Sequence, residues 1–150
     1  MPVERGAGII IFRKTLEGRK YLILRSSRQE SEIDKGKSMK EFLDFPKGLL
    51  EAGETGLDAA KREVREEAGI KEYEVIPEFK ETVRYFTRRD GKPIPKFVAL
   101  FLAETKTEKV TLSWEHDKYE WLGYNEASER ISLKEMKKAL AKAEEFLNKR

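Results

Sequence analysis

The sequence predicts an α/β domain in which a mixed β-sheet is covered by helices. Short apolar runs rich in β-forming residues lie on both sides of one mid-chain helix, and the chain ends in a second helix. With 150 residues and 39% hydrophobic content, the chain is long enough to bury a sizeable core. We therefore expect a single domain over residues 1–150.

The first part of the chain predicts a β-hairpin followed by a polar segment. The apolar runs Gly6–Phe12 and Tyr21–Arg25 predict two strands, and the glycine-containing connection between them is typical of a hairpin. Residues 26–41 are almost entirely polar, which predicts either a surface loop or a lid over a site. A short strand is expected at Phe42–Phe45, because a proline follows it.

The mid-chain segment Thr55–Ala68 predicts an amphipathic helix. Thr55 can cap the first turn together with Asp58, and Gly69 is placed to end the helix in a left-handed conformation. Its apolar residues recur at helical spacing and predict the face that packs on the sheet: Leu57, Ala60, Val64 and Ala68.

Two more strands and a final helix complete the prediction. Pro77–Arg89 and Lys96–Glu104 read as strands joined by an Asp-Gly turn, and a short strand is expected at Tyr119–Tyr124. The helix after Ser132 begins with a predicted capping box between Ser132 and Glu135. Its apolar stripe predicts core packing: Leu133, Met136, Leu140, Ala143 and Leu147.

Composition excludes several kinds of site. The absence of cysteine excludes disulfides and thiolate metal sites, and with one histidine any metal site must consist mainly of carboxylates. The net charge of +3 is too balanced to indicate a nucleic-acid scaffold by itself. No apolar run reaches transmembrane length and no secretory segment precedes the first strand, so we expect a cytoplasmic protein without membrane contact.

The mid-chain helix carries glutamates that share one face. Glu63, Glu66 and Glu67 stand at i, i+3 and i+4, where like charges repel by some tenths of a kcal/mol per pair. One interpretation is a solvated charged surface, with Lys61, Arg62 and Arg65 offsetting part of the repulsion. The other is a site for a hard divalent cation such as Mg²⁺ or Mn²⁺, which prefers carboxylate oxygens.

The surrounding residues favour the metal site. They fit the pattern G-x5-E-x7-R-E-U-x-E-E-x-G-U, where U is a bulky aliphatic residue, from Gly48 to Ile70. This pattern resembles the signature of the Nudix hydrolases. The resemblance implies an α/β/α sandwich and metal-dependent attack of water on a phosphoanhydride.

The resemblance also implies roles for the residues of the pattern. Glu63, Glu66 and Glu67 would bind the metal together with the Gly48 carbonyl, and Glu63 would act as general base. Arg62 would hold a glutamate in its rotamer. Glu54 would support the metal site, or would simply be a charge at the helix N-terminus.

Segments outside this pattern are similar to the asymmetrical diadenosine tetraphosphate hydrolases, which release ATP and AMP: "GAGIIIFR", "PKG", "KFVALFLAE", "LSWEHDKYEWLGYNEA" and "LKEMKKAL". The resemblance implies that Glu104 completes the metal site, although it could be only a solvent-facing strand end. It suggests phosphate contacts for Lys47, Lys96 and His116, and adenine stacking for Tyr85 and Tyr119. Each of these five side chains could instead serve the surface or the core.

The sequence also departs from these hydrolases before the signature. Phe45 stands where many relatives have a proline, "KEFLD" replaces a histidine-containing segment, and the 26–41 loop is longer. These changes leave the metal chemistry intact and put base recognition in question.

Other functions stay open at this point. We expect the protein to be a monomer. Its expected small-molecule partner is a dinucleoside polyphosphate substrate. Pyrophosphohydrolysis of 5′-triphosphorylated RNA, of other nucleotides or of diphosphoinositol polyphosphates would use similar groups, and Arg84, Arg88, Arg89 and Lys92 form a basic stretch that would suit RNA. A nucleotide-sensing or protein-binding module is the non-enzymatic alternative. The intact signature argues for catalysis.

Overall fold

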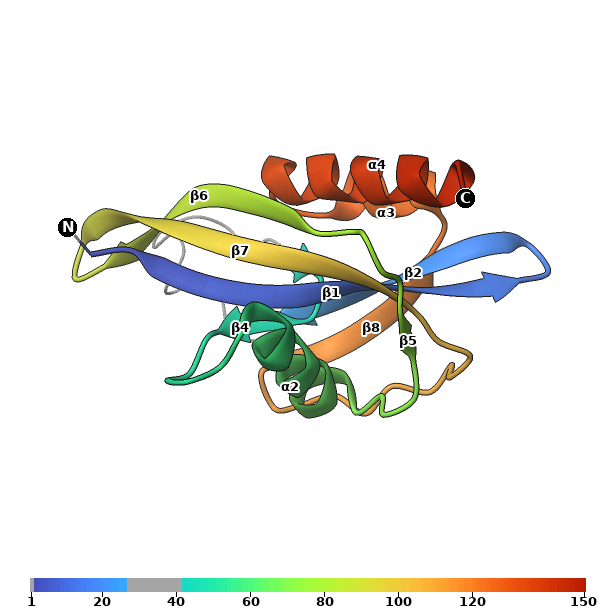
Figure 1. Ribbon diagram of the computed structural model, residues 1–150, viewed down its shortest axis with the longest axis horizontal. Helices are drawn as coiled ribbons and strands as arrows, with labels where there is room; N and C mark the ends of the chain where they lie inside the picture. Colours follow the sequence, from blue (N-terminus) through green and yellow to red (C-terminus); the bar gives the residue numbers. More distant parts are fainter. Residues whose placement is uncertain (1, 27–41) are drawn as a thin grey trace.

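The computed structural model describes residues 2–26 and 42–150, which form one mixed sheet with helices on both faces (Figure 1). The predicted fold class is confirmed. The predicted loop or lid falls largely on residues 27–41, outside the described part of the chain.

The longest strands of the sheet form two hairpins, one near the N-terminus and one in the second half of the chain. The described residues contain β1 (Glu4–Thr15), β2 (Gly18–Ser26), β3 (Leu43–Asp44), β4 (Lys47–Leu49), β5 (Glu74–Val75), β6 (Glu81–Arg89), β7 (Lys92–Glu104) and β8 (His116–Leu122).

Strand β1 runs through the middle of this sheet. Along one edge it pairs in parallel with β7, from Glu4 opposite Lys96 to Phe12 opposite Glu104. Along its other edge the partner changes: residues 6–8 pair with β4, whereas residues 12–15 pair with β2. The rest of β2, after its pairing with β1, lies between β3 and β8. The sheet therefore divides where β4 is inserted beside β1.

The helices α2 (Gly56–Ala68), α3 (Tyr124–Arg130) and α4 (Lys134–Asn148) cover the sheet from two sides, with α2 on one face and α3 and α4 on the other (Figure 1). Alternate residues of β1 supply both cores. Ile9 belongs to the cluster beneath α2, and Ile10 to the cluster beneath α4. Most residues of the predicted stripes are buried: Ala60, Val64 and Ala68 in α2, and Met136, Leu140, Ala143 and Leu147 in α4. Leu57 and Leu133 are only partly buried.

The ends of α2 confirm the sequence prediction. Thr55 Oγ1 accepts a hydrogen bond from the Asp58 backbone N–H at 3.1 Å, and the Asp58 carboxylate accepts from the Thr55 N–H in return. Gly69 follows the helix with φ of 66°. These caps fix both ends of the helix that carries the glutamates.

The predicted start of α4 was wrong. The helix begins after Leu133, with no capping bond from a side chain. Ser132 instead bonds across to β3: its Oγ accepts from the Leu43 N–H at 2.8 Å, and its own N–H donates to the Leu43 carbonyl at 3.1 Å. The tertiary contact with β3 thus replaces the local cap.

Several boundaries also differ from the prediction. The strand expected from Pro77 begins at Glu81, because Glu78 has φ of 72° and cannot belong to an extended strand. The strand expected at 119–124 runs over His116–Leu122, and Tyr124 instead begins α3. The strands β4 and β5 and helix α3 were not predicted, because such short elements carry little periodicity. No helix among the described residues is long and apolar enough to cross a membrane.

The C-terminal end of α2 generates a stability prediction. A Cβ at Gly69 would lie 2.9 Å from the Thr111 Cβ, in a left-handed conformation that by itself costs an L-residue roughly 1–2 kcal/mol. Gly69→Ala should therefore lower the free energy of unfolding by about 2 kcal/mol or more in urea titrations.

Gly91→Ala is the matched control, because Gly91 also has positive φ, 75°, but no atom lies within 4 Å of its Cβ position. It should cost only the conformational part, about 1 kcal/mol. Equal losses in the two variants would contradict the role given to the Thr111 contact.

Candidate active site

A cavity of about 560 Å³ opens where the sheet divides around β4. Carboxylates from α2 lie on one part of its wall, and cationic side chains lie on another. The lining side chains that carry charge or titrate are Asp44, Lys47, Glu51, Arg62, Glu63, Glu66, Glu67, Arg89, Lys96, Glu115 and His116.

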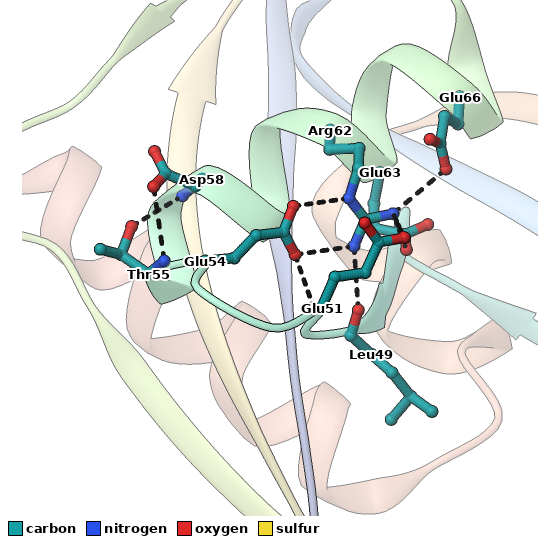
Figure 2. A network of polar contacts seen from close by, with 8 residues as sticks. All are labelled: Leu49, Glu51, Glu54, Thr55, Asp58, Arg62, Glu63 and Glu66. Carbon is teal, nitrogen blue, oxygen red and sulfur yellow. Dashed lines mark hydrogen bonds and ion pairs between the residues drawn. The ribbon is translucent and has the colours of Figure 1, made fainter.

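Arg62 is the central residue of the carboxylate cluster (Figure 2). Its Nε and Nη2 donate to the two oxygens of Glu54 at 2.7 and 3.0 Å, which is a bidentate pair. Its Nη1 donates to Glu63 at 2.9 Å and to Glu66 at 3.2 Å, and Nη2 also donates to the Leu49 carbonyl at 2.9 Å. One guanidinium thus connects the loop before α2 to two glutamates of the helix.

The contacts between Arg62 and Glu54 shift the pKa of both side chains. The hydrogen bonds from Arg62 lower the pKa of Glu54 to about 2. The same bonds to Glu54, together with those to Glu63, raise the pKa of Arg62 above its ordinary value despite partial desolvation. Glu54 is therefore ionised at neutral pH and acts on Arg62, not directly on the cavity.

Gly48 lies in direct contact with Glu63. A Cβ built on Gly48 would overlap the Glu63 carboxylate, so only glycine leaves room for that side chain. The close approach brings the backbone of β4 and the Glu63 carboxylate into one place.

Glu67 is buried beside Glu63 and receives one backbone hydrogen bond. The N–H of Lys47 donates to Glu67 Oε1 at 3.2 Å. Burial, followed by the neighbouring charge of Glu63, raises the pKa of Glu67 above its ordinary value. Glu63 and Glu67 are 8% and 6% exposed, so their mutual repulsion is poorly screened.

The oxygens of Glu63, Glu66, Glu67 and the Gly48 carbonyl are chemically suited to a divalent cation, because carboxylate and carbonyl oxygens are the ligands that hard cations prefer. A cation here would also relieve the repulsion between Glu63 and Glu67. Within residues 2–26 and 42–150, however, no three histidine or carboxylate side chains already meet as a metal-binding group. Arg62 holds Glu66 and one oxygen of Glu63, so binding requires at least Glu66 to turn away from Arg62.

The cationic part of the wall is formed by β4, β6 and β7. The Lys47 Nζ lies 3.2 Å from Asp44 Oδ2. Burial alone would lower the pKa of Lys47, but Asp44 and Tyr85 raise it above its ordinary value. Burial and the charge of Lys47 together lower the pKa of Lys96 to about 8, so it is largely protonated at neutral pH.

Two further cavity residues contribute nitrogen donors. Arg89 pairs with Glu4 through Nε at 2.5 Å and Nη2 at 3.1 Å. His116 Nδ1 is buried without a hydrogen-bond partner among the described residues, and burial lowers the pKa of His116. Lys47, Lys96 and His116, all predicted from the sequence, are thus gathered in one cavity.

The two tyrosines predicted to stack on adenine are placed differently. Tyr85 packs partly against the core beneath α4, with its ring centre 5.9 Å from Lys96 Nζ. Tyr119 packs against the core beneath α2. Neither is among the residues that line the cavity.

Glu104 lies outside the cavity. It stands at the end of β7, five residues beyond Ala99, which is level with Gly48 across β1. At about 3.3 Å per residue, that is roughly 16 Å along the strand. Glu104 instead borders a separate hollow with Lys14, at 3.9 Å from its Nζ.

Sequence reasoning missed Asp44, Glu51, Arg89 and Glu115 as cavity residues. Asp44 and Glu115 lie within segments that were singled out, "KEFLD" and "LSWEHDKYEWLGYNEA", so their place in those segments was an available signal. Arg89 had been noted only as part of a basic stretch. Asp44 and Glu115 are the two carboxylates from outside the signature that line the cavity.

Comparisons with known proteins agree with this geometry. The chain is 35% identical over 147 residues to the asymmetrical bis(5′-nucleosyl)-tetraphosphatase of Mus musculus, covering 95% of each chain. It superimposes on a C. elegans Ap4A hydrolase solved as a binary complex with a TM-score of 0.83 and 29% identity, covering 98% of this chain and 99% of that one. An RNA pyrophosphohydrolase of Bartonella bacilliformis is 32% identical over 57% of this chain and 47% of its own length.

The family comparison covers almost the whole chain. The NUDIX domain matches residues 2–144, which include the signature from Gly48 to Ile70 and every charged cavity residue described above. The resemblance read from the sequence is therefore confirmed, and the chain belongs to the NUDIX domain family.

Proposed function

We propose that this protein hydrolyses dinucleoside polyphosphates, cleaving diadenosine tetraphosphate asymmetrically into ATP and AMP. The observation that carries the proposal is one cavity lined both by the carboxylates of α2, of which Glu63 and Glu67 are buried, and by several cationic side chains. Carboxylates suit a divalent metal, and several cations suit a chain of linked phosphates. The names of the mouse and C. elegans relatives, which span nearly the whole chain, support the same substrate.

The proposed metal is Mg²⁺ or Mn²⁺, held by the Gly48 carbonyl, Glu63, Glu66 and Glu67. When bound, such a cation stabilises charge on phosphoryl oxygens and makes water more acidic. The proposal replaces Glu104 with Glu115 as the carboxylate from outside the signature, because Glu104 does not line the cavity and Asp44, which does, is paired with Lys47.

Side chains of this protein would perform the remaining steps. Glu63, oriented by Arg62 at 2.9 Å, is the proposed general base toward the attacking water. Glu54 keeps Arg62 in place through the bidentate pair. Lys47, Lys96, Arg89 and His116 would bind phosphate oxygens and set which phosphorus lies over the carboxylates.

A second candidate is pyrophosphohydrolysis of 5′-triphosphorylated RNA. The partial match to the Bartonella bacilliformis enzyme favours it, as does the hairpin of β6 and β7, on which Arg84, Arg88 and Lys92 are exposed. Because that match covers 57% of the chain, against 95% for the mouse relative, we place this reaction second.

A product analysis tests the proposal. The protein, Mg²⁺ and diadenosine tetraphosphate are incubated in ¹⁸O-labelled water, and products are resolved by chromatography and mass spectrometry. We expect only ATP and AMP, with label in one of them, and at least a hundredfold lower turnover for Glu63→Gln because an amide is a weaker ligand and no base.

Two molecules of ADP per substrate would show a different register of the phosphates over the carboxylates and contradict the asymmetric assignment. Absence of cleavage, with rapid release of pyrophosphate from triphosphorylated RNA, would favour the second candidate. Neither reaction occurring with any divalent metal would exclude both.

The placement of Glu115 and Glu104 gives a sharper prediction. Glu115→Gln should lower kcat at least tenfold, since it removes a carboxylate from the cavity wall. Glu104→Gln should leave kcat within about twofold, because its side chain borders another hollow and its contact with Lys14 is a surface pair. The reverse pattern would restore the assignment that the sequence suggested.

A further inference from the structure

A buried carboxylate lies within the cavity that is proposed to bind polyphosphate. Asp44 is 6% exposed and lines the same wall as Lys47, Lys96 and His116. A negative charge at such a place repels a phosphate chain, and the low dielectric of a buried site strengthens that repulsion. Because the Asp44 carboxylate cannot attract phosphate, its role lies in its contacts with neighbouring residues.

The contacts of Asp44 indicate that use. Its Oδ1 accepts a hydrogen bond from the Phe45 N–H at 2.7 Å, which fixes the carboxylate against its own backbone. Its Oδ2 faces the Lys47 ammonium at 3.2 Å and has no other partner among the described residues. The carboxylate is therefore anchored on one side and directed toward Lys47 on the other.

The backbone of Lys47 is held independently of that pair. Its N–H donates to Glu67 Oε1 at 3.2 Å, and β4 pairs Lys47 with Gly8 of β1. Only the flexible four-carbon side chain is left to be placed, and fixing a lysine side chain costs much of its rotamer freedom. Asp44, together with Tyr85, provides that constraint before any substrate arrives.

We propose that Asp44 is a positioning residue that holds the Lys47 ammonium at a fixed place beside the carboxylate cluster, so that it meets the phosphate nearest the attacked phosphorus. The inference rests on the proposed function. An ammonium has three donors, so the contacts with Asp44 and Tyr85 still leave one for a phosphate oxygen. The placement acts on the rate, because a displacement of about 1 Å at a reacting group can cost a hundredfold.

This role predicts that the loss of Asp44 lowers kcat without raising KM. Asp44→Asn keeps the shape and the oxygen that accepts from Phe45, while it removes the ion pair and one negative charge. We expect kcat to fall about tenfold or more, because Lys47 is no longer placed. KM should stay unchanged or fall, because the cavity becomes less repulsive to phosphate.

A double-mutant comparison separates positioning from a general structural effect. With Lys47→Met, which leaves no cation to place, Asp44→Asn should lower kcat by less than about twofold. Asp44→Glu retains a carboxylate and should recover part of the lost kcat. The control is Asp117→Asn, which breaks another Asp pair, with Arg25 at 2.8 Å, outside the cavity and should leave kcat unchanged.

The same loss of kcat from Asp44→Asn in both Lys47 backgrounds would overturn the proposal, as would a rise in KM without a change in kcat. If Asp44→Asn does not fold, Asp44→Glu carries the test alone: its kcat should fall in the Lys47 background and not in the Lys47→Met background. Equal kcat losses in both would again overturn the proposal.

A structural readout keeps this inference separate from the proposed reaction. Crystal structures of the wild type and of Asp44→Asn should show the Lys47 ammonium in one place in the first and spread over several rotamers in the second. An unchanged Lys47 position would overturn the role of Asp44 even if diadenosine tetraphosphate is cleaved as proposed. A displaced Lys47 in a protein that does not cleave that substrate would refute only the proposed function.

Discussion

The guanidinium of Arg62 is the interaction on which the site depends. It joins the Leu49 carbonyl and Glu54, which belong to β4 and the following loop, to Glu63 and Glu66 of α2. Without it, buried Glu63 would lie beside Glu67 with no described cation bonded to it, and the loop between β4 and α2 would lose its principal side-chain link to the helix. Arg62 thus holds Glu63 and Glu66 of α2 in place through its contacts with several carboxylates.

The sheet supplies the second condition, a place where these groups meet the phosphate-binding cations. Because β1 changes partner from β4 to β2 along one edge, the sheet divides and leaves the cavity between the two parts. Lys47 and Gly48 are adjacent in β4, so the cations and the carboxylate cluster meet along a single short strand. The backbone bond from Lys47 to Glu67 at 3.2 Å is the direct connection between the two halves of the site.

Local patterns predicted much of this arrangement, and long-range contacts account for the rest. The caps at Thr55 and Gly69 and the buried stripe of α2 follow from residues near each other in sequence, and the structure reproduces them. Ser132 was misread because its partner, Leu43, is far away in sequence. Glu104 and Glu115 could not be separated by pattern alone: both are glutamates near a strand end, and only the pairing register shows that one lies roughly 16 Å along β7 from the level of Gly48.

The central claim is that the carboxylates around Gly48 bind a divalent metal while Arg62 stays bound to Glu54. A crystal structure of the protein with Mn²⁺, with data collected at a wavelength where manganese scatters anomalously, tests it most directly. The account predicts an anomalous peak among the Gly48 carbonyl, Glu63 and Glu67, with Glu66 turned away from Arg62 and the Arg62–Glu54 pair intact. A peak beside Glu104, or none near Glu63 at saturating Mn²⁺, would contradict it.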